Sequence, residues 1–178
     1  PGGEVVSHKA VEQGDADAQF NLGLMYANGQ GVAKNVAMAV KWYRKAAEQG
    51  YAKAQYNLGI MYANGHGVGQ SDAMAVKWYR KAADQGHTAA YLNLGFTYLD
   101  RVPQNLSEAL RWFQKAEAAG DPKAASAIQD VLRLQQLERD AAAEAVAASN
   151  SSLPSQSSPP AIPIGARVEL RGLQAKPE

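Results

Sequence analysis

Apolar residues recur at helical spacing along the first part of the chain. Residues 15–28 carry apolar side chains at positions i, i+4, i+7 and i+8, and residues 36–49 carry a second stripe of this kind. This spacing places the apolar side chains on one face of an α-helix. The Gly- and Asn-rich stretch between them, residues 29–34, is typical of a turn. The pattern predicts a pair of helices, A and B, with these apolar stripes: Ala18, Leu22, Met25 and Tyr26 in A, and Ala39, Trp42, Tyr43 and Ala46 in B.

The same pattern returns further along the chain. Residues 37–47 and 73–83 share the letters AMAVKWYRKAA, and three tryptophans, Trp42, Trp78 and Trp112, follow one another at spacings of 36 and 34 residues. Self-similarity at a period of about 20–50 residues indicates a solenoid, in which each unit buries its apolar face against its neighbours. The predicted fold class is therefore an all-α solenoid of two-helix repeats.

Cap residues mark the bounds of the units. Asn35, Ser71 and Asn105 precede the three B helices and are good N-cap residues, and a glycine follows each B helix. The last predicted helix has an expected buried stripe at Ala127, Val131, Leu134 and Ala141. The predicted organisation is the end of a preceding repeat (1–14), three repeats (15–50, 51–86 and 87–120) and a C-terminal capping helix (121–147).

Each A helix carries a glycine at its centre: Gly23, Gly59 and Gly95. A glycine inside a helix costs about 1 kcal/mol relative to alanine. Its recurrence at one phase predicts a packing role, in which the missing side chain lets the Trp–Tyr pair of a B helix approach closely. A hinge at each glycine is the alternative interpretation.

The composition of the chain excludes several classes of function. The chain has 18 basic and 17 acidic residues, a net charge of +1, and thus no electrostatic footprint for nucleic acid or an anionic membrane. No apolar run approaches the ~20 residues that a membrane helix needs, and the first residues do not form a signal peptide. The chain has no cysteine, which is compatible with a reducing compartment. We expect a cytoplasmic protein without a nucleic-acid or membrane partner.

Residues that could carry chemistry are few. Neither His66 nor His87 has a second histidine or a carboxylate at ligand spacing, and a metal site needs three or four converging ligands. The GQGV and GHGV loops lack the Gly-Lys-Ser/Thr sequence of phosphate-binding loops. The sequence shows no pairing of a nucleophile with a base. We therefore predict that the chain is not an enzyme and binds no cofactor and no metal.

Basic residues follow one side of the B helices. Two interpretations remain open: a stripe for an acidic partner, or a solvated face supported by i, i+4 pairs such as Arg44–Glu48 and Arg80–Asp84. The row consists of Lys41, Arg44, Lys45, Lys77, Arg80, Lys81, Arg111 and Lys115.

The repeated letters resemble those of the Sel-one-like repeat family, a relative of the tetratricopeptide repeat. The resemblance rests on NLGLMYANGQGV with AVKWYRKAAEQG and on NLGIMYANGHGV with AVKWYRKAADQG, and it covers residues 15–120. The third unit departs from the pattern at its shorter loop, DRVPQN. The resemblance implies a right-handed α/α superhelix whose concave face is lined mainly by A helices. It also implies adaptor roles in signalling, protein quality control or the assembly of complexes.

Three rows on the A helices keep their phase beside the core stripe, and two of them change identity from unit to unit. A solenoid can encode specificity at such positions. We therefore predict a monomeric adaptor or scaffold that binds a protein or peptide on its concave face. The alternatives are core packing for the apolar rows, a backbone-bonding role for the asparagines and, for the whole chain, a regulatory or targeting domain of a larger enzyme. The candidate residues are Phe20, Asn21, Leu24, Tyr56, Asn57, Ile60, Leu92, Asn93 and Phe96.

The composition shifts abruptly after Ala147. Residues 148–166 are rich in Ser and Pro and predict a disordered linker, because they cannot bury enough apolar surface to offset the entropy of ordering. Residues 167–178 begin with an alternation of charged and apolar side chains that is typical of a strand. This segment is similar to the opening of a small KOW-like barrel, so we expect a truncated β-rich module there.

Overall fold

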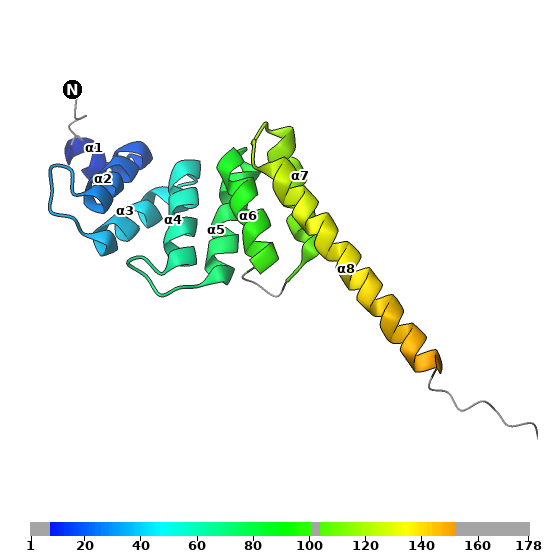
Figure 1. Cartoon of the computed structure of the whole chain (residues 1–178). Helices are drawn as coiled ribbons and strands as arrows, with labels where there is room; N and C mark the ends of the chain where they lie inside the picture. The colour runs from blue at the N-terminus through cyan, green and yellow to red at the C-terminus, as the bar shows by residue number, and fades with distance from the viewer. Residues whose placement is uncertain (1–7, 101–103, 152–178) are drawn as a thin grey trace, which may run out of the picture. The chain divides into compact units, whose positions relative to one another are not determined.

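The computed structural model describes residues 8–100 and 104–151. This part of the chain consists of eight α-helices and contains no strand, which confirms the predicted all-α fold (Figure 1). The helices are α1 (His8–Glu12), α2 (Ala16–Asn28), α3 (Val36–Glu48), α4 (Ala52–Asn64), α5 (Asp72–Asp84), α6 (Thr88–Asp100), α7 (Leu106–Ala118) and α8 (Ala124–Ser151).

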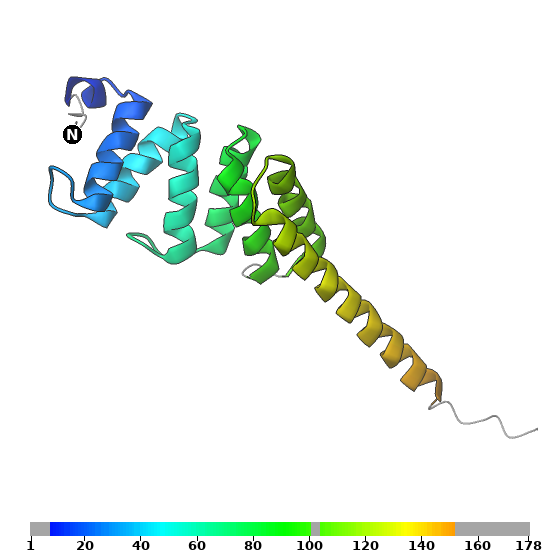
Figure 2. The ribbon, with the colours of Figure 1, turned by 45° about the horizontal axis from the view of Figure 1, so that its top comes forward.

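Consecutive helices form the predicted pairs. Helix α2 packs against α3, α4 against α5, and α6 against α7, so that α2, α4 and α6 are A helices and α3, α5 and α7 are B helices. The first two B helices also pack against the following A helix, α3 on α4 and α5 on α6, as Figure 2 shows. The chain divides into two compact units at Arg139, and all three helix pairs belong to the first unit.

The predicted caps begin the B helices. The side chains of Asn35, Ser71 and Asn105 accept hydrogen bonds from the backbone N–H three residues on, at 3.0, 3.3 and 2.9 Å. These bonds satisfy N–H groups that have no partner within the helix. Gly50 follows α3 with φ of +93°, the left-handed conformation expected after a helix.

One backbone hydrogen bond closes the A–B connection in every repeat. The N–H of the B-helix cap donates to the carbonyl of the A-helix tyrosine: Asn35 to Tyr26 at 2.8 Å, Ser71 to Tyr62 at 2.9 Å and Asn105 to Tyr98 at 3.0 Å. The third connection is two residues shorter than the others and has lost the glycines. The shorter loop therefore keeps the same closing hydrogen bond between the cap and the tyrosine.

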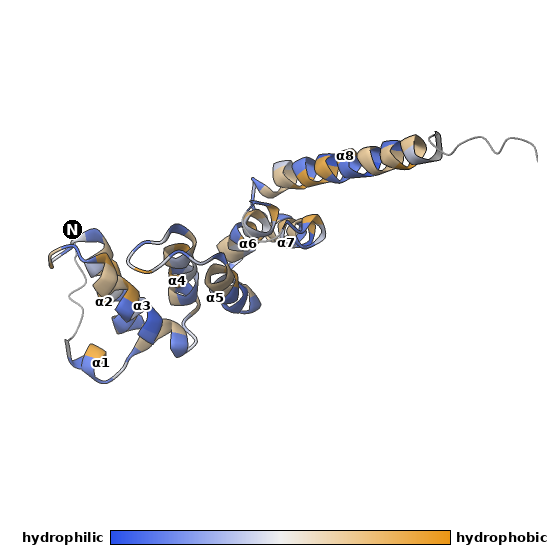
Figure 3. Ribbon diagram, turned by 90° about the horizontal axis from the view of Figure 1, so that it is seen from below, coloured by the Kyte–Doolittle hydropathy of each residue, from blue (hydrophilic) through white to orange (hydrophobic). Residues whose placement is uncertain are grey.

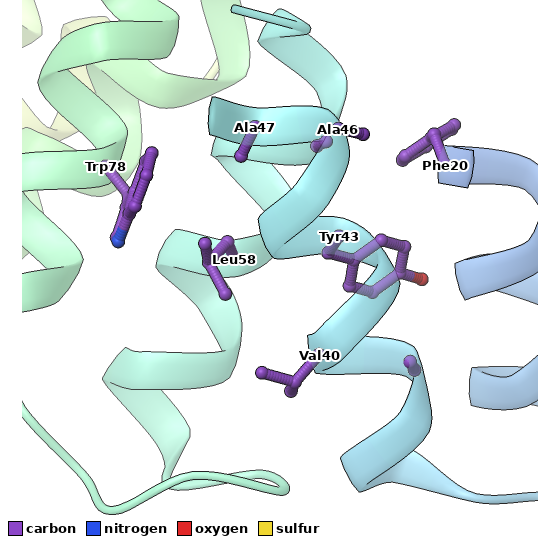
Figure 4. Close-up of a cluster of buried hydrophobic side chains, with 9 residues drawn as sticks. Phe20, Val40, Tyr43, Ala46, Ala47, Leu58 and Trp78 are labelled. Atoms are coloured by element: carbon purple, nitrogen blue, oxygen red, sulfur yellow. The ribbon is translucent and has the colours of Figure 1, made fainter. Parts of the chain in front are cut away.

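The central core cluster spans the junction of the first two repeats. Tyr43, Leu58 and Trp78 are 1%, 0% and 6% exposed, and they come from α3, α4 and α5. In the close-up, Leu58 and Trp78 point toward one another (Figure 4). Each unit therefore buries apolar surface against its neighbour, as expected of a solenoid.

The central glycines of the A helices receive an aromatic ring from their own B helix. A Cβ on Gly23 would lie 2.7 Å from Cδ1 of Tyr43, and a Cβ on Gly95 would overlap the ring of Phe113. This close approach confirms the packing role of the glycines. The ring is the tyrosine or phenylalanine alone, however, because the tryptophan packs toward the preceding repeat: Trp78 lies in the cluster between repeats one and two, and Trp112 in the cluster between repeats two and three.

Helix α8 differs from its expected bounds. It begins at Ala124, because Asp121 accepts a hydrogen bond from the N–H of Lys123 (2.9 Å) in the turn before it, and it continues past Ala147 to Ser151 through alanines that favour helix. Ala127 and Val131 are buried, but Ala141 is exposed, so its expected burial was wrong. Hydrophobic and hydrophilic residues alternate along α8 (Figure 3).

Some expectations fall outside the described residues. These are most of the predicted preceding repeat, the linker beyond Ser151 and the strand-like segment 167–178. They stay predictions.

Candidate protein-interaction surface

The first candidate row, Phe20, Tyr56 and Leu92, packs inside the stack. The ring of Phe20 lies 5.7 Å from that of Tyr43 and 5.2 Å from that of Tyr51, and only 8% of Phe20 is exposed. Tyr56 and Leu92 are half-buried, and Leu92 packs against the cluster that joins α6, α7 and α8. This row holds neighbouring helices together and offers only part of its surface to a partner.

The second apolar row opens toward solvent along the chain. Leu24 and Ile60 are half-buried against the cores of the first and second repeats. Phe96 is 41% exposed, although the edge of its ring rests on Phe113 at 5.0 Å between centroids. An aromatic side chain that is fixed on one side and exposed on the other is a typical anchor for a partner.

The asparagine row makes side-chain hydrogen bonds. Asn93 Nδ2 donates to Tyr56 Oη at 3.2 Å, joining two A helices, and Asn57 bonds to Tyr43. Asn21 Nδ2 lies 3.4 Å from Asp17 Oδ2, one turn earlier in its own helix. The recurrence of asparagine thus has a structural role, although its partners are side chains and not the backbone.

In the first two repeats, the residue just before the next A helix packs on the first row. Tyr51 packs on Phe20, and His87, at the same phase, stacks on Tyr56 with 4.5 Å between ring centroids. Burial and a hydrogen bond to Asp17 raise the pKa of Tyr51 to about 12. Burial, and secondarily Lys53, lowers the pKa of His87. These aromatic rings therefore favour their neutral forms in the folded protein.

Hydrogen bonds between glutamine side chains join the helices of a repeat and were not predicted from the sequence. Gln85 Nε2 donates to Gln55 Oε1 at 2.7 Å, and the buried Gln55 donates to the carbonyl of Ala47 at 3.1 Å. The pair Gln49–Gln19 repeats the bond at 2.8 Å. The signal was present in the chain, because a polar residue that recurs beside an apolar stripe needs an internal partner when buried.

The basic row also makes structural contacts. Lys45, Lys81 and Lys115 each place Nζ over the tryptophan of their own helix, at 4.7, 4.9 and 4.4 Å from the ring. Arg44 and Arg80 donate to the tyrosine hydroxyls of the next A helix: Arg44 Nη2 to Tyr62 at 2.8 Å and Arg80 Nη2 to Tyr98 at 2.7 Å. The arginines thus join neighbouring repeats through these longer-range bonds.

One carboxylate distinguishes the junction of repeats two and three. Glu108 Oε2 accepts from Trp112 Nε1 at 3.2 Å and lies 3.6 Å from Arg80 Nη2. The residue at the same phase in the preceding repeat is Met74. Within the described residues, Trp78 Nε1 is accordingly buried without a hydrogen-bond partner.

These contacts define what the surface can do chemically. Among the residues that the structure describes, no group of histidine and carboxylate side chains is placed to hold a metal ion. No helix in the same ranges has the length and apolar character needed to cross a membrane. The accessible features are Phe96 with the half-buried Leu24 and Ile60 on the A helices, and an exposed cationic row on the B helices, both suited to non-covalent binding.

Comparison with known proteins places these features in a family. The Sel1 repeat family model matches residues 16–51, 52–87 and 88–121. No curated protein matches the chain.

Solved structures are similar to the repeat region. A Sel1 repeat protein from Oxalobacter formigenes shares 44% identity at a TM-score of 0.60, over 65% of this chain and 47% of that one. The protective antigen c5321 of uropathogenic Escherichia coli, which displays an SLR fold, shares 42% at a TM-score of 0.63, over 65% of this chain and 25% of that one.

A more distant structure has the same arrangement. Cysteine rich protein B of Helicobacter pylori shares 26% identity at a TM-score of 0.52, over 66% of this chain and 86% of that one. The aligned part of the present chain spans 47% of the Oxalobacter formigenes protein and 25% of the Escherichia coli antigen. Because the family model covers more than half of the chain in three consecutive units, the chain belongs to the Sel1 repeat family.

Proposed function

We propose that this chain is a non-catalytic adaptor that binds a peptide or protein surface on its A helices. Sel1 repeat proteins are in general protein-interaction scaffolds. The proposed contacts are the accessible parts of the candidate rows, chiefly the exposed Phe96 and the half-buried Ile60. We expect the chain to act as a monomer, because a single solenoid already presents all three rows.

One observation carries this proposal: Phe96 is 41% exposed while its neighbours in the same helix, Leu94 and Gly95, are fully buried. Full burial of a phenylalanine side chain is worth about 1.5–3 kcal/mol, and the exposed 41% of Phe96 forgoes part of this free energy. A partner that covers Phe96 would recover that free energy. The ring is already held against Phe113, so little conformational entropy is lost on binding.

Selection of ligands from a random peptide display library tests the proposal. Peptides selected on the full chain should bind the Phe96→Ser variant about tenfold more weakly or worse, which corresponds to at least ~1.4 kcal/mol. The matched control is Lys77→Ala on α5, also an exposed position, which should bind like the wild type. Peptides that bind Phe96→Ser unchanged and Lys77→Ala weakly would overturn the placement on the A helices.

A further inference from the structure

We propose a second binding site, beyond the A-helix surface: a groove beside α3 that takes an acidic peptide segment of a partner protein. The groove has a volume of about 390 Å³ and lies between the exposed face of α3 and the loop that contains Gly67 and Val68. Ligand pockets span about 300–1,000 Å³, so this volume suits a few residues of an extended peptide.

The lining of the groove combines positive charge with an apolar floor. Lys41, Arg44 and Lys45 come from α3 and are exposed, and Glu48 is the one acidic residue among the lining side chains. Val40, which is 3% exposed, contributes to the apolar part. Three cations against one carboxylate favour an anionic ligand, and the floor favours an apolar side chain beside the anion.

The next repeat shows a carboxylate in the corresponding place. Arg80, which has the phase of Arg44, donates to Tyr98 and pairs with Glu108 at 3.6 Å. Arg44 makes the same bond to its tyrosine, Tyr62, at 2.8 Å. A guanidinium has five N–H donors, and the bond to the tyrosine hydroxyl uses only part of them. An arginine that is bonded to its tyrosine can therefore also bind a carboxylate.

At the first junction the chain supplies no such carboxylate. The residue at the phase of Glu108 is Met74, which packs against the apolar core. Arg44 is exposed beside two lysines, and its bond to Tyr62 uses only part of the five N–H donors of the guanidinium. The match between these two junctions identifies the missing group as a carboxylate, which an aspartate or glutamate of a partner would provide.

The loop wall of the groove is held in place. Gly67 has φ of +71°, and a Cβ on it would lie 2.8 Å from the carbonyl oxygen of Val36 at the start of α3. Only glycine fits this approach and this backbone conformation readily. The third repeat has DRVPQN in place of the Gly-x-Gly-Val loop, so the sequence for this wall does not recur there.

The test uses the full chain and two fluorescein-labelled, end-blocked hexapeptides. One alternates Glu with Val, and the other has Gln in place of every Glu. The acidic peptide should bind about tenfold or more tightly than its Gln counterpart, and added salt should weaken it. Amide NMR shifts should concentrate in α3 and residues 65–68.

Two variants and a matched control locate the site. Arg44→Gln should weaken binding of the acidic peptide about tenfold, and Met74→Glu should weaken it as well by giving Arg44 an internal carboxylate. Arg80→Gln, the same change one repeat later, should leave binding within about twofold, because Arg80 already pairs with Glu108. Thermal unfolding of each variant confirms that the fold is kept.

Three results would overturn the proposal. They are equal binding of the Gln peptide, equal losses in Arg44→Gln and Arg80→Gln, and displacement of the acidic peptide by inorganic phosphate or a short oligonucleotide at the same concentration of charge. None of these results depends on Phe96, so this site and the A-helix surface succeed or fail separately.

Discussion

A Cβ placed on Gly59 would lie 2.5 Å from Cδ1 of Tyr79. The two residues belong to the A and B helices of the second repeat, and Tyr79 is 3% exposed. The glycine therefore sets how closely the two helices approach, and the same relationship occurs in the other two repeats.

Gly59→Ala should destabilise the protein by about 1–3 kcal/mol. Alanine gains up to ~1 kcal/mol of helix propensity, but the buried ring must move, and the cost of overpacking is larger. Urea unfolding followed by circular dichroism measures the difference. Gly69→Ala is the control, because nothing lies within 4 Å of its added Cβ and its φ is not positive. A rise in the unfolding midpoint of Gly59→Ala would contradict the packing role.

Trp78→Ala should destabilise far more than Lys77→Ala. Trp78 is 6% exposed and belongs to the core cluster between the first two repeats, so its truncation should cost about 3–5 kcal/mol. Lys77 is exposed, and its replacement should cost under about 0.5 kcal/mol. Denaturant midpoints of the two variants decide the matter, since similar values would mean that the buried face of α5 has been wrongly assigned.

Gln55 and Gln85 should show a measurable coupling free energy. Gln85 donates to Gln55 between the A and B helices of the second repeat, so a double-mutant cycle with Gln55→Ala and Gln85→Ala should give about 0.5–1.5 kcal/mol. The pair Gln55 and Lys81 supplies a comparison, in which near additivity is expected. A cycle that closes without coupling for Gln55 and Gln85 would show that the bond adds nothing to stability.

His87 should make the protein less stable in mild acid. Burial lowers its pKa in the folded state, so the unfolded state binds the proton more readily. The contribution of the neutral ring is thus present above the ordinary value of about 6.5 and is lost as the pH falls below it. His87→Tyr copies Tyr51 of the preceding repeat and should remove this dependence. Unfolding curves of both proteins at about pH 8 and pH 5 test this, and parallel losses would refute it.

The sequence by itself determined the helices and their order. The caps Asn35, Ser71 and Asn105 and the apolar stripes placed the B helices within a residue of their observed bounds. These signals are local, because a cap and a helical face depend on residues three or four apart. The recurrence of glycine at one phase likewise predicted a close contact with the aromatic pair of a B helix, of which the structure uses only the tyrosine or phenylalanine.

Only the tertiary structure decided the partners of the polar and aromatic side chains. Arg44 reaches a tyrosine 18 residues away, Gln85 a glutamine 30 residues away and Asn93 a tyrosine 37 residues away. It also decided that Phe20 is buried while Phe96 is exposed, although both lie in candidate rows on the A helices. Burial depends on which residue the neighbouring repeat brings against a position, and such contacts form only when the repeats stack.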